Sequence, residues 1–403
     1  MIRTPGSAQE KVNSSSTFNS MALEKIVSAG ELTKEIDVKL KRVQQFLQRQ
    51  SLKGILLTKV NNFSWITAGI GDNHIVITSE TGPASLLIMR DGKKYLIANT
   101  TEVSHLMQED LNGLGYEPLQ FEWFEATGDI DPKLKAIESF GESGEIGTDV
   151  PYSNLKYIEN EFAPLRYELT PSEIKKYRWV GNQSSEAVAA VCRLIKPGMT
   201  EKEIESVTSN ELMKRGLRPT VILIGTDERV LNYYHYPPQE KKLKKYAIVN
   251  VCARRWGLVS SVARYVYFGT PPDSLLKALN ASATICANMQ HASKPGAVAS
   301  SIFTQTKNWY KQFGYEDYWK KIHVGGGIGY AEREWVTSDD CKEILKPNQA
   351  LAWNPFTKGA LSFDTFILYD SSIENITSLT NWPSLKIKIE DKIYTMPGLL
   401  IRR

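Results

Sequence analysis

The sequence predicts an α/β protein of two domains, for three reasons. The chain has 403 residues, which is more than a single domain usually contains. Helical and strand patterns alternate from Leu32 to Val150, as in a sheet covered by helices. Two long helical segments then lead into a strand-rich C-terminal third. We therefore expect a smaller α/β domain over residues 31–165 and a larger α+β domain over residues 166–403.

The first domain is expected to alternate helices and strands. Hydrophobic residues at helical spacing predict a helix over Leu32–Gln50. Asn61 is a good N-cap and predicts that a second helix begins there. The pair Asp91-Gly92 predicts a tight hairpin. The other elements are expected to be strands at Gly54–Thr58, Ile75–Thr78, Ala84–Met89, Lys94–Ala98 and Glu117–Phe121, and a helix over Glu102–Asn112.

The second domain is expected to begin with two helices after a linker over Pro151–Tyr167. Ser172 is in position to cap the first helix, and Thr200 with Glu203 forms a capping box for the second. No internal repeat is visible in the sequence. The remaining elements are expected to be strands at Thr220–Gly225, Ala247–Cys252 and Arg264–Gly269, helices at Asp273–Ser293 and Ala297–Phe313, and further strands with turns at Lys358-Gly359 and Asp370-Ser371-Ser372.

Composition excludes several classes of protein. Hydrophobic residues make up 42% of the chain and charged residues 23%, which is typical of a soluble globular protein. A net charge of +4 is too small to indicate nucleic-acid binding, and no apolar run approaches the ~18 residues of a membrane span. Residues 1–30 are polar and rich in Ser, with no apolar core of a secretory signal, so we expect a disordered extension. The four cysteines show no paired or metal-binding spacing, which favours reduced thiols and a cytoplasmic location.

Five segments together carry a resemblance to a known family. They are Glu168–Ile204, His235 in the segment NYYHYP, the segment HVGGGIGY from His323, the segment LKPNQALAWNP from Leu345, and Ser362-Phe363-Asp364-Thr365. In this order and spacing the chain resembles the creatinase/Xaa-Pro peptidase superfamily over residues 35–400. The resemblance implies a pita-bread catalytic domain, preceded by the smaller α/β domain that creatinase and prolidases carry. It also implies a homodimer.

The resemblance places the family's five metal ligands on residues that cannot replace them. The two aspartates fall on Asn250 and Ser261, the histidine on Gly326, and the two glutamates on Asn354 and Phe363. Divalent metals need charged oxygen or imidazole ligands to offset their dehydration, and amide and hydroxyl oxygens alone rarely hold them. We therefore expect no metal and no other cofactor.

The remaining polar groups of the pocket define the candidate site. The resemblance makes His235 and Glu334 the candidate catalytic residues, with His235 as general acid/base. Arg333 stands where the family often has a substrate-contacting histidine, and its guanidinium suits a carboxylate or phosphate. Loss of the imidazole at Gly326 is expected to leave room for a larger ligand. The substrate-binding candidates are Arg333, Asn250, Ser261, Asn354, Tyr330 and, as a weaker acid/base candidate, His323.

Two further expectations concern Arg264 and Cys252. Arg264 is expected to pair with Asp364, chiefly to hold the strands together. Cys252 lies in the altered metal strand, but no base is visibly assigned to it, so a role as nucleophile is disfavoured.

Three functions stay open from the sequence. The first is a metal-independent, creatinase-like hydrolase or lyase acting on a small polar C–N compound or a short peptide-like substrate. Against creatine itself, the creatinase carboxylates fall on Ala263 and Asn354. The second is an inactive pseudo-peptidase that binds a ligand or a protein partner. The third, a metal-dependent Xaa-Pro peptidase, would require a metal site that the sequence lacks.

Overall fold

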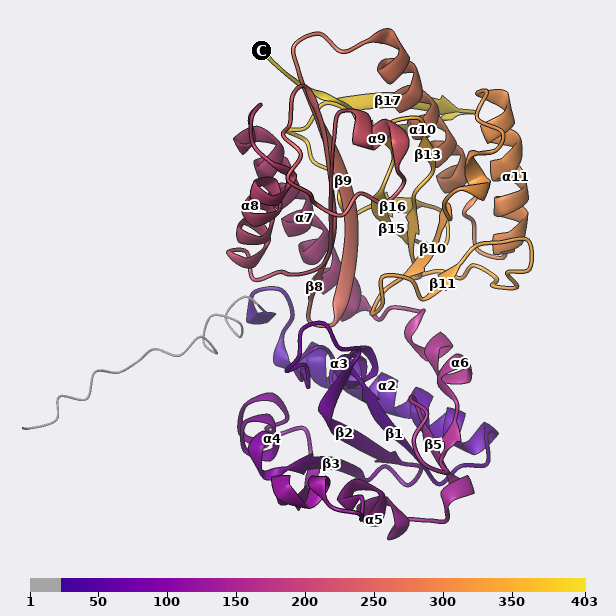
Figure 1. The fold of residues 1–403 in the computed structure, drawn as a ribbon. Coiled ribbons are helices and arrows are strands. Elements are labelled where there is room, and N and C mark those ends of the chain that lie inside the picture. The colour runs from indigo at the N-terminus through magenta and orange to yellow at the C-terminus, as the bar shows by residue number, and fades with distance from the viewer. Residues whose placement is uncertain (1–22) are drawn as a thin grey trace, which may run out of the picture.

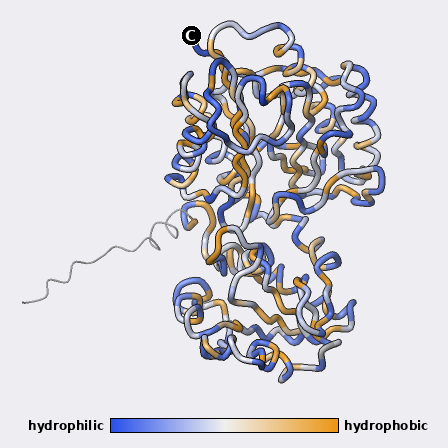
Figure 2. Tube along the Cα trace, in the orientation of Figure 1, coloured by the Kyte–Doolittle hydropathy of each residue, from blue (hydrophilic) through white to orange (hydrophobic). Residues whose placement is uncertain are grey.

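A computed structural model describes residues 23–403 (Figure 1). Of the extension expected over residues 1–30, residues 1–22 lie outside this described part. Figure 1 shows two bodies, the N-terminal domain in indigo to magenta and the C-terminal domain in magenta through orange to yellow. Hydrophobic segments follow the strands inside each body (Figure 2). None of the helices between residues 23 and 403 is both long and apolar enough to cross a bilayer.

The N-terminal domain is built on a mixed sheet of six strands in the order β4-β3-β2-β1-β5-β6. The central strand β1 pairs antiparallel with β2 and parallel with β5, so hydrogen bonds on both edges place it in the core. The strands are β1 (Gly54–Lys59), β2 (Thr81–Met89), β3 (Lys94–Asn99), β4 (Glu117–Phe121), β5 (Ile146–Thr148) and β6 (Lys156–Tyr157). The helices are α2 (Ala29–Arg49), α3 (Val60–Ile66), α4 (Thr100–His105), α5 (Pro132–Glu138) and α6 (Glu159–Phe162).

The strand predicted at Ile75–Thr78 is wrong. Ile75, Val76 and Ile77 are 55%, 61% and 71% exposed and belong to no strand. Asn73, just before them, donates its side-chain amide to carbonyls of β1 and β2, at 3.1 Å to Thr58 and 2.8 Å to Ala84. Strand β1 already pairs with β2 and β5, and β2 with β1 and β3, so neither has a free edge for a further strand. Strand propensity describes a residue's fit to a sheet and does not create one.

Two helix starts also differ from the prediction. Helix α3 begins at Val60, with Lys59 rather than Asn61 at its N-cap. Helix α7 (Pro171–Leu194) is capped by Thr170, whose side chain accepts from the Glu173 amide, and not by Ser172. The predicted linker over 151–167 contains β6 and α6 and is therefore structured.

The C-terminal domain repeats one arrangement, two helices followed by three antiparallel strands. The first half contains α7, α8 (Glu201–Met213), β7 (Arg218–Thr226), β8 (Tyr246–Arg255) and β9 (Leu258–Phe268), with the short α9 (Glu228–Asn232) between β7 and β8. The second half contains α10 (Asp273–Ala292), α11 (Ala299–Gln312), β10 (Gly325–Ile328), β12 (Ala350–Trp353) and β15 (Asp364–Leu368). The capping box predicted at Thr200 is confirmed. The remaining strands are β11 (Trp335–Val336), β13 (Phe356–Thr357), β14 (Ala360–Leu361), β16 (Ile373–Asn375), β17 (Ser384–Ile389), β18 (Lys392–Pro397) and β19 (Leu400–Arg402).

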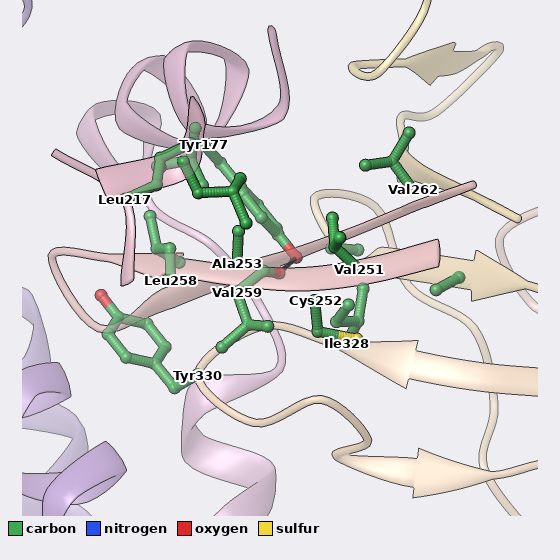
Figure 3. Close-up of a cluster of buried hydrophobic side chains, with 14 of the residues drawn as sticks. Tyr177, Leu217, Val251, Cys252, Ala253, Leu258, Val259, Val262, Ile328 and Tyr330 are labelled. Atoms are coloured by element: carbon green, nitrogen blue, oxygen red, sulfur yellow. Dashed lines mark hydrogen bonds between the residues drawn. The ribbon is translucent and has the colours of Figure 1, made fainter. Parts of the chain in front are cut away.

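The turn between β8 and β9 meets the N-terminal domain. Trp256 and Gly257 both have positive φ, 52° and 76°, which allows a tight two-residue turn. A Cβ at Gly257 would lie 2.7 Å from the Ser64 side chain and 2.7 Å from the Tyr330 ring, so glycine is required here. Figure 3 shows the apolar cluster around this hairpin, including Val259 and Tyr330. The hairpin thereby fixes one end of the domain junction.

Four buried charged side chains at the domain junction are paired with one another. Lys39 of α2 lies 2.7 Å from Glu35 and 2.8 Å from Glu173 of α7, and Lys176 lies 2.9 Å from Glu35. All four side chains are fully buried. The Tyr330 hydroxyl donates to Glu173 at 2.7 Å and accepts from Lys39 at 3.1 Å. Because removal of either member leaves an uncompensated buried charge, this network holds the two domains in one arrangement.

Candidate functional site

The β8–β9 hairpin and the start of β15 bring three of the five family metal positions together. Asn250 lies on β8, and Ser261 lies on β9 opposite Cys252. The Ser261 amide donates to the Thr365 hydroxyl at 2.8 Å, and that hydroxyl donates to the Ser261 carbonyl at 3.0 Å. The Phe363 carbonyl accepts from the amide of Ala263 at 2.9 Å. These bonds join the two halves of the domain at the candidate site.

The neighbouring strands β10 and β12 supply the other two positions. Gly326 on β10 pairs with Ala352 on β12, which itself pairs with Thr365 on β15. Asn354 directly follows β12, and its side-chain amide donates to the His323 carbonyl at 3.1 Å. Figure 1 shows β10 and β15 beside the β8–β9 hairpin. All five positions therefore belong to adjoining strands of one site.

The residues at these positions do not fit a divalent metal. Asn250, Ser261 and Asn354 present neutral oxygens, whereas Gly326 and Phe363 present no donor at all. Residues 23–403 contain no group of three or more His, Cys, Asp or Glu side chains arranged to hold a metal ion. Hard and borderline cations require charged ligands in such a site.

A cationic side chain lies among these positions. The guanidinium carbon of Arg333 is 5.2 Å from the centre of the Phe363 ring, and its Nη2 is 3.4 Å from the Asn354 Oδ1. Its Nη1 donates to the Glu332 carbonyl at 2.5 Å, and its buried Nε has no partner. Burial lowers the pKa of Arg333, and in the described part of the chain no carboxylate lies within 4 Å of it. The site therefore holds a largely desolvated positive charge that makes no ion pair with any described carboxylate, although the charge of Glu332 acts on it from farther away.

The expected space at the glycine run is filled. A Cβ at Gly326 would lie 2.0 Å from the Trp335 carbonyl oxygen, and a Cβ at Gly327 would lie 2.3 Å from the Trp335 indole nitrogen. Strand β11 pairs with β10 through these residues and covers the run. The prediction that loss of the histidine leaves room for a larger ligand is therefore wrong at Gly326. The glycines are needed because Trp335 packs against them.

Two predicted histidines lie close to the guanidinium. Burial, and after it the charges of Arg333 and His235, lower the pKa of His323 to about 4, which puts these three side chains in one neighbourhood. The buried Nδ1 of His323 has no partner. His235 is exposed in the loop between α9 and β8, next to the fully buried Tyr236. A neutral imidazole and an exposed imidazole thus border the same cation.

Glu334 and Tyr330 are engaged elsewhere. Glu334 lies 2.7 Å from Arg166, and its second oxygen accepts from the Tyr330 amide at 2.9 Å. The Tyr330 hydroxyl belongs to the junction network with Lys39 and Glu173. No hydrogen bond or ion pair within residues 23–403 joins Glu334 to His235. The catalytic role of Glu334 and the ligand-binding role of Tyr330 stay predictions, and the contacts of both residues are those of the domain junction.

The strands also contain the predicted Arg264–Asp364 pair and the Cys252 thiol. The pairing of Arg264 with Asp364 is confirmed at 2.9 Å, with both side chains buried. Burial raises the pKa of the Cys252 thiol to about 11, and its sulfur lies 3.2 Å from the Ser261 hydroxyl. A thiol that stays protonated at neutral pH is a poor nucleophile, which agrees with the disfavoured role of Cys252.

The unpaired Asn250 and the aromatic Phe363 complete the arrangement. Asn250 is 6% exposed, and its Oδ1 has no partner. Phe363 provides a flat face for Arg333, a role that the sequence did not suggest beyond the loss of a carboxylate. Together the groups can bind an anionic ligand through Arg333 and orient its neutral parts through the amides. They can move a proton only through a histidine.

Comparisons with known proteins agree on the scaffold. Residues 175–395 match the model of Metallopeptidase family M24. An uncharacterized peptidase of Staphylococcus haemolyticus is 22% identical over 338 residues, which are 79% of this chain and 91% of that protein. The structure of a Xaa-Pro dipeptidase from Bacillus anthracis has a TM-score of 0.72 and 20% identity, covering 91% of this chain and all of the other. The prolidase from Pyrococcus horikoshii has a TM-score of 0.69 and 18% identity, covering 84% and 98%.

These comparisons confirm the predicted resemblance and the predicted pita-bread fold with its N-terminal domain. The matched segment begins in α7 and ends in β18, so it contains all five family metal positions. It spans more than half of the chain. The chain belongs to metallopeptidase family M24.

Proposed function

We propose that this chain works without a metal, as a hydrolase or lyase of a small C–N compound that carries a carboxylate. Arg333 binds the carboxylate, and His235 transfers the proton. The observation that carries this proposal is the part-buried Arg333 guanidinium, which lies among the family metal positions and makes no ion pair with a carboxylate in the described part of the chain.

The environment of Arg333 supports a carboxylate as its partner. A buried cation without a counter-ion is costly, and a ligand that supplies a negative charge offsets that cost. The guanidinium is held from two sides, by the Phe363 ring and by the Glu332 carbonyl, so it is oriented before a ligand arrives. A planar fork held in this way matches the two oxygens of a carboxylate.

The histidines support proton transfer by His235 rather than by His323. With a pKa of about 4, His323 is neutral at pH 7 and cannot act as an acid there. His235 is exposed, so it can exchange protons with water between turnovers. In hydrolysis it would take the proton of the attacking water and return it to the leaving nitrogen. Asn250 and Asn354 would orient the neutral groups of the substrate.

A second function, binding without turnover, is supported by the position of Glu334. The carboxylate expected to assist His235 is committed to Arg166 at 2.7 Å. What is left near Arg333 is amide, hydroxyl and imidazole, which suffice for recognition. In this alternative the chain is a pseudo-peptidase that captures the same carboxylate compound.

The third function is that of a metal-dependent Xaa-Pro peptidase, and two structural neighbours are named a prolidase and a Xaa-Pro dipeptidase. Its support is limited to the scaffold, because the identities are 18% and 20% and the donor set does not fit a metal.

The test begins with the purified full chain. Metal content is measured by elemental analysis, and binding of N-substituted amino acids, dipeptides and their amides is measured by calorimetry. We expect compounds with a free carboxylate to bind and their amides to bind at least about 10-fold more weakly. Arg333→Met should abolish binding, whereas Arg333→Lys should retain part of it. Equal binding of acids and amides would refute the role of Arg333.

Turnover separates the first two functions. If the enzyme proposal is right, His235→Ala should abolish conversion of a bound compound while leaving its Kd within about 3-fold. A bound compound that the wild type never converts would favour the pseudo-peptidase. One or two tightly held metal ions per chain, with cleavage that a chelator stops, would establish the peptidase instead.

A further inference from the structure

The amide of Asn250 is buried, but the protein does not use it. Asn250 is 6% exposed, and its Oδ1 is buried without a partner. No hydrogen bond joins its side chain to any residue between 23 and 403. Buried polar groups are normally hydrogen-bonded, because leaving them unpaired is costly. A free amide inside a site therefore marks a place where a ligand group can bind.

The other two polar residues at the family metal positions are already engaged. Asn354 uses both ends of its side-chain amide, since Nδ2 donates to the His323 carbonyl at 3.1 Å and Oδ1 lies 3.4 Å from Arg333 Nη2. The Ser261 hydroxyl lies 3.2 Å from the Cys252 sulfur. Of these three polar residues, Asn250 is the one whose side chain has no partner within the described part of the chain.

A short series of contacts connects Asn250 to Arg333. Asn250 on β8 pairs with Ala263 on β9, so their side chains lie on the same face of the sheet. The Ala263 amide donates to the Phe363 carbonyl at 2.9 Å, and the Phe363 ring lies 5.2 Å from the guanidinium carbon of Arg333. Cys252, two residues along β8, shares this face, and the charge of Arg333 opposes the rise in its thiol pKa. A compact ligand can therefore reach both the amide and the guanidinium.

The shape of a free amide selects the ligand group that complements it. An amide side chain presents an acceptor and a donor next to each other. A terminal –CO–NH2 group also has a donor and an acceptor on one edge, so the two groups can form a pair of hydrogen bonds. A trans secondary amide points its N–H and C=O in opposite directions and can satisfy only one of the two. The match holds whichever terminal atom of Asn250 is the oxygen, because the pair forms in either orientation.

We propose that Asn250 binds a terminal –CO–NH2 group of the ligand whose carboxylate binds Arg333. The ligand is then a compact acid with a carbamoyl or carboxamide end, such as an N-carbamoyl amino acid or the monoamide of a dicarboxylic acid. This inference rests on the carboxylate-binding role proposed for Arg333. It makes Asn250, at a family metal position, a residue that determines specificity through hydrogen bonds.

The experiment compares matched acids by calorimetric titration of the full chain. The pairs are N-carbamoylglycine with N-acetylglycine and succinamate with 4-oxopentanoate, and the members of each pair differ only by NH2 in place of CH3. We expect the –CO–NH2 member of at least one pair to bind at least about 10-fold more tightly, because the methyl compound leaves the Asn250 acceptor unpaired. A preference in one pair only supports the inference and identifies the ligand as a ureido acid or a carboxamide acid.

Two variants assign the preference to Asn250. Asn250→Leu keeps the branched shape of the side chain without a polar atom, and it should reduce the preference to within about 2-fold. Asn210→Leu, a matched change at an exposed asparagine of α8, should leave the preference unchanged. A full preference in Asn250→Leu would overturn the inference. The comparison of acids on the wild type needs no variant, so it decides the question even if Asn250→Leu does not fold.

Failure of this inference differs from failure of the proposed function. If the two members of each pair bind the wild type equally well, the inference is overturned and water is left as the partner of Asn250, but the carboxylate site stands. If none of the four acids binds at about 10 mM, the carboxylate site at Arg333 is refuted, and the inference falls with it.

Discussion

The buried charges at the domain junction and the buried charge at the family metal positions are arranged in opposite ways. At the junction, Arg166 lies between Glu334 and Glu159, at 2.7 and 3.2 Å. Burial alone would lower the pKa of Arg166, but these two carboxylates outweigh it and raise that pKa. At the metal positions, burial lowers the pKa of Arg333, and the charge of Glu332, which makes no ion pair with it, opposes this only in part. The paired cation stabilises the junction, whereas we propose that the cation without an ion pair binds a ligand.

The comparison is tested most strongly by removing each cation in turn. Arg166→Met should lower the free energy of unfolding by about 3–5 kcal/mol, because it leaves Glu334 and Glu159 buried without a partner. Arg333→Met, the matched change, should leave it within about 1 kcal/mol or raise it slightly, because a desolvated charge is lost. Urea unfolding measures both. Similar losses of unfolding free energy in the two variants would contradict the distinction between a paired and an unpaired cation.

The next test is how the stability that Glu173 contributes at the domain junction depends on pH. Burial would raise the pKa of Glu173, but Lys39 and Lys176 outweigh this effect and hold the pKa well below its ordinary value. The ionised carboxylate therefore stabilises the fold fully above the unfolded-state pKa of about 4.3, and this contribution is lost as pH falls toward the folded-state pKa.

Glu173→Gln should accordingly cost about 3 kcal/mol at pH 7. The difference from the wild type should shrink as the pH falls from 5 toward 3. Unfolding curves at several pH values check this. A difference that grows on acidification would mean that Glu173 is protonated in the fold.

A smaller effect is expected at the covered glycine run. Gly326→Ala should cost about 1–3 kcal/mol, because its Cβ would meet the Trp335 carbonyl at 2.0 Å. Gly30→Ala is the control: no atom lies within 4 Å of a Cβ there, and Gly30 is in α2. That variant should be unchanged or up to about 1 kcal/mol more stable. Thermal unfolding compares the two, and equal stabilities would show that β11 moves aside freely.

One substitution is expected to have no effect on metal binding. Asn250→Asp should not restore metal binding, because the other four positions still lack charged ligands and Arg333 repels a cation. Elemental analysis after dialysis against Mn²⁺ or Zn²⁺ should find no more metal than in the wild type. Stoichiometric uptake would count against the placement of the five positions.

The features that could be predicted from the sequence are those encoded by neighbouring residues or by the family motifs. The capping box of Thr200 and Glu203 lies within four residues, so the sequence alone contains it. The pairing of Arg264 with Asp364 followed from the family frame and is present. Ile75–Ile77 mislead because strand propensity does not say whether a sheet edge is free.

The partners of Glu334 and Tyr330 could not be predicted in this way. Arg166 is 168 positions from Glu334, and Glu173 is 157 positions from Tyr330. No periodic pattern connects residues so far apart, and both pairs form only when the two domains meet. The pairing of Arg218 with Arg254 also depends on the β7–β8 register. Trp335 over Gly326 is likewise a contact between strands.

The contact of Trp335 with Gly326 also bears on how this chain could change over generations. Regaining the family histidine would require a side chain where a neighbouring strand already lies, so that single exchange would damage the protein before it could bind a metal. A metal site at these positions therefore cannot be rebuilt by this substitution alone, because strand β11 would first have to move away from Gly326.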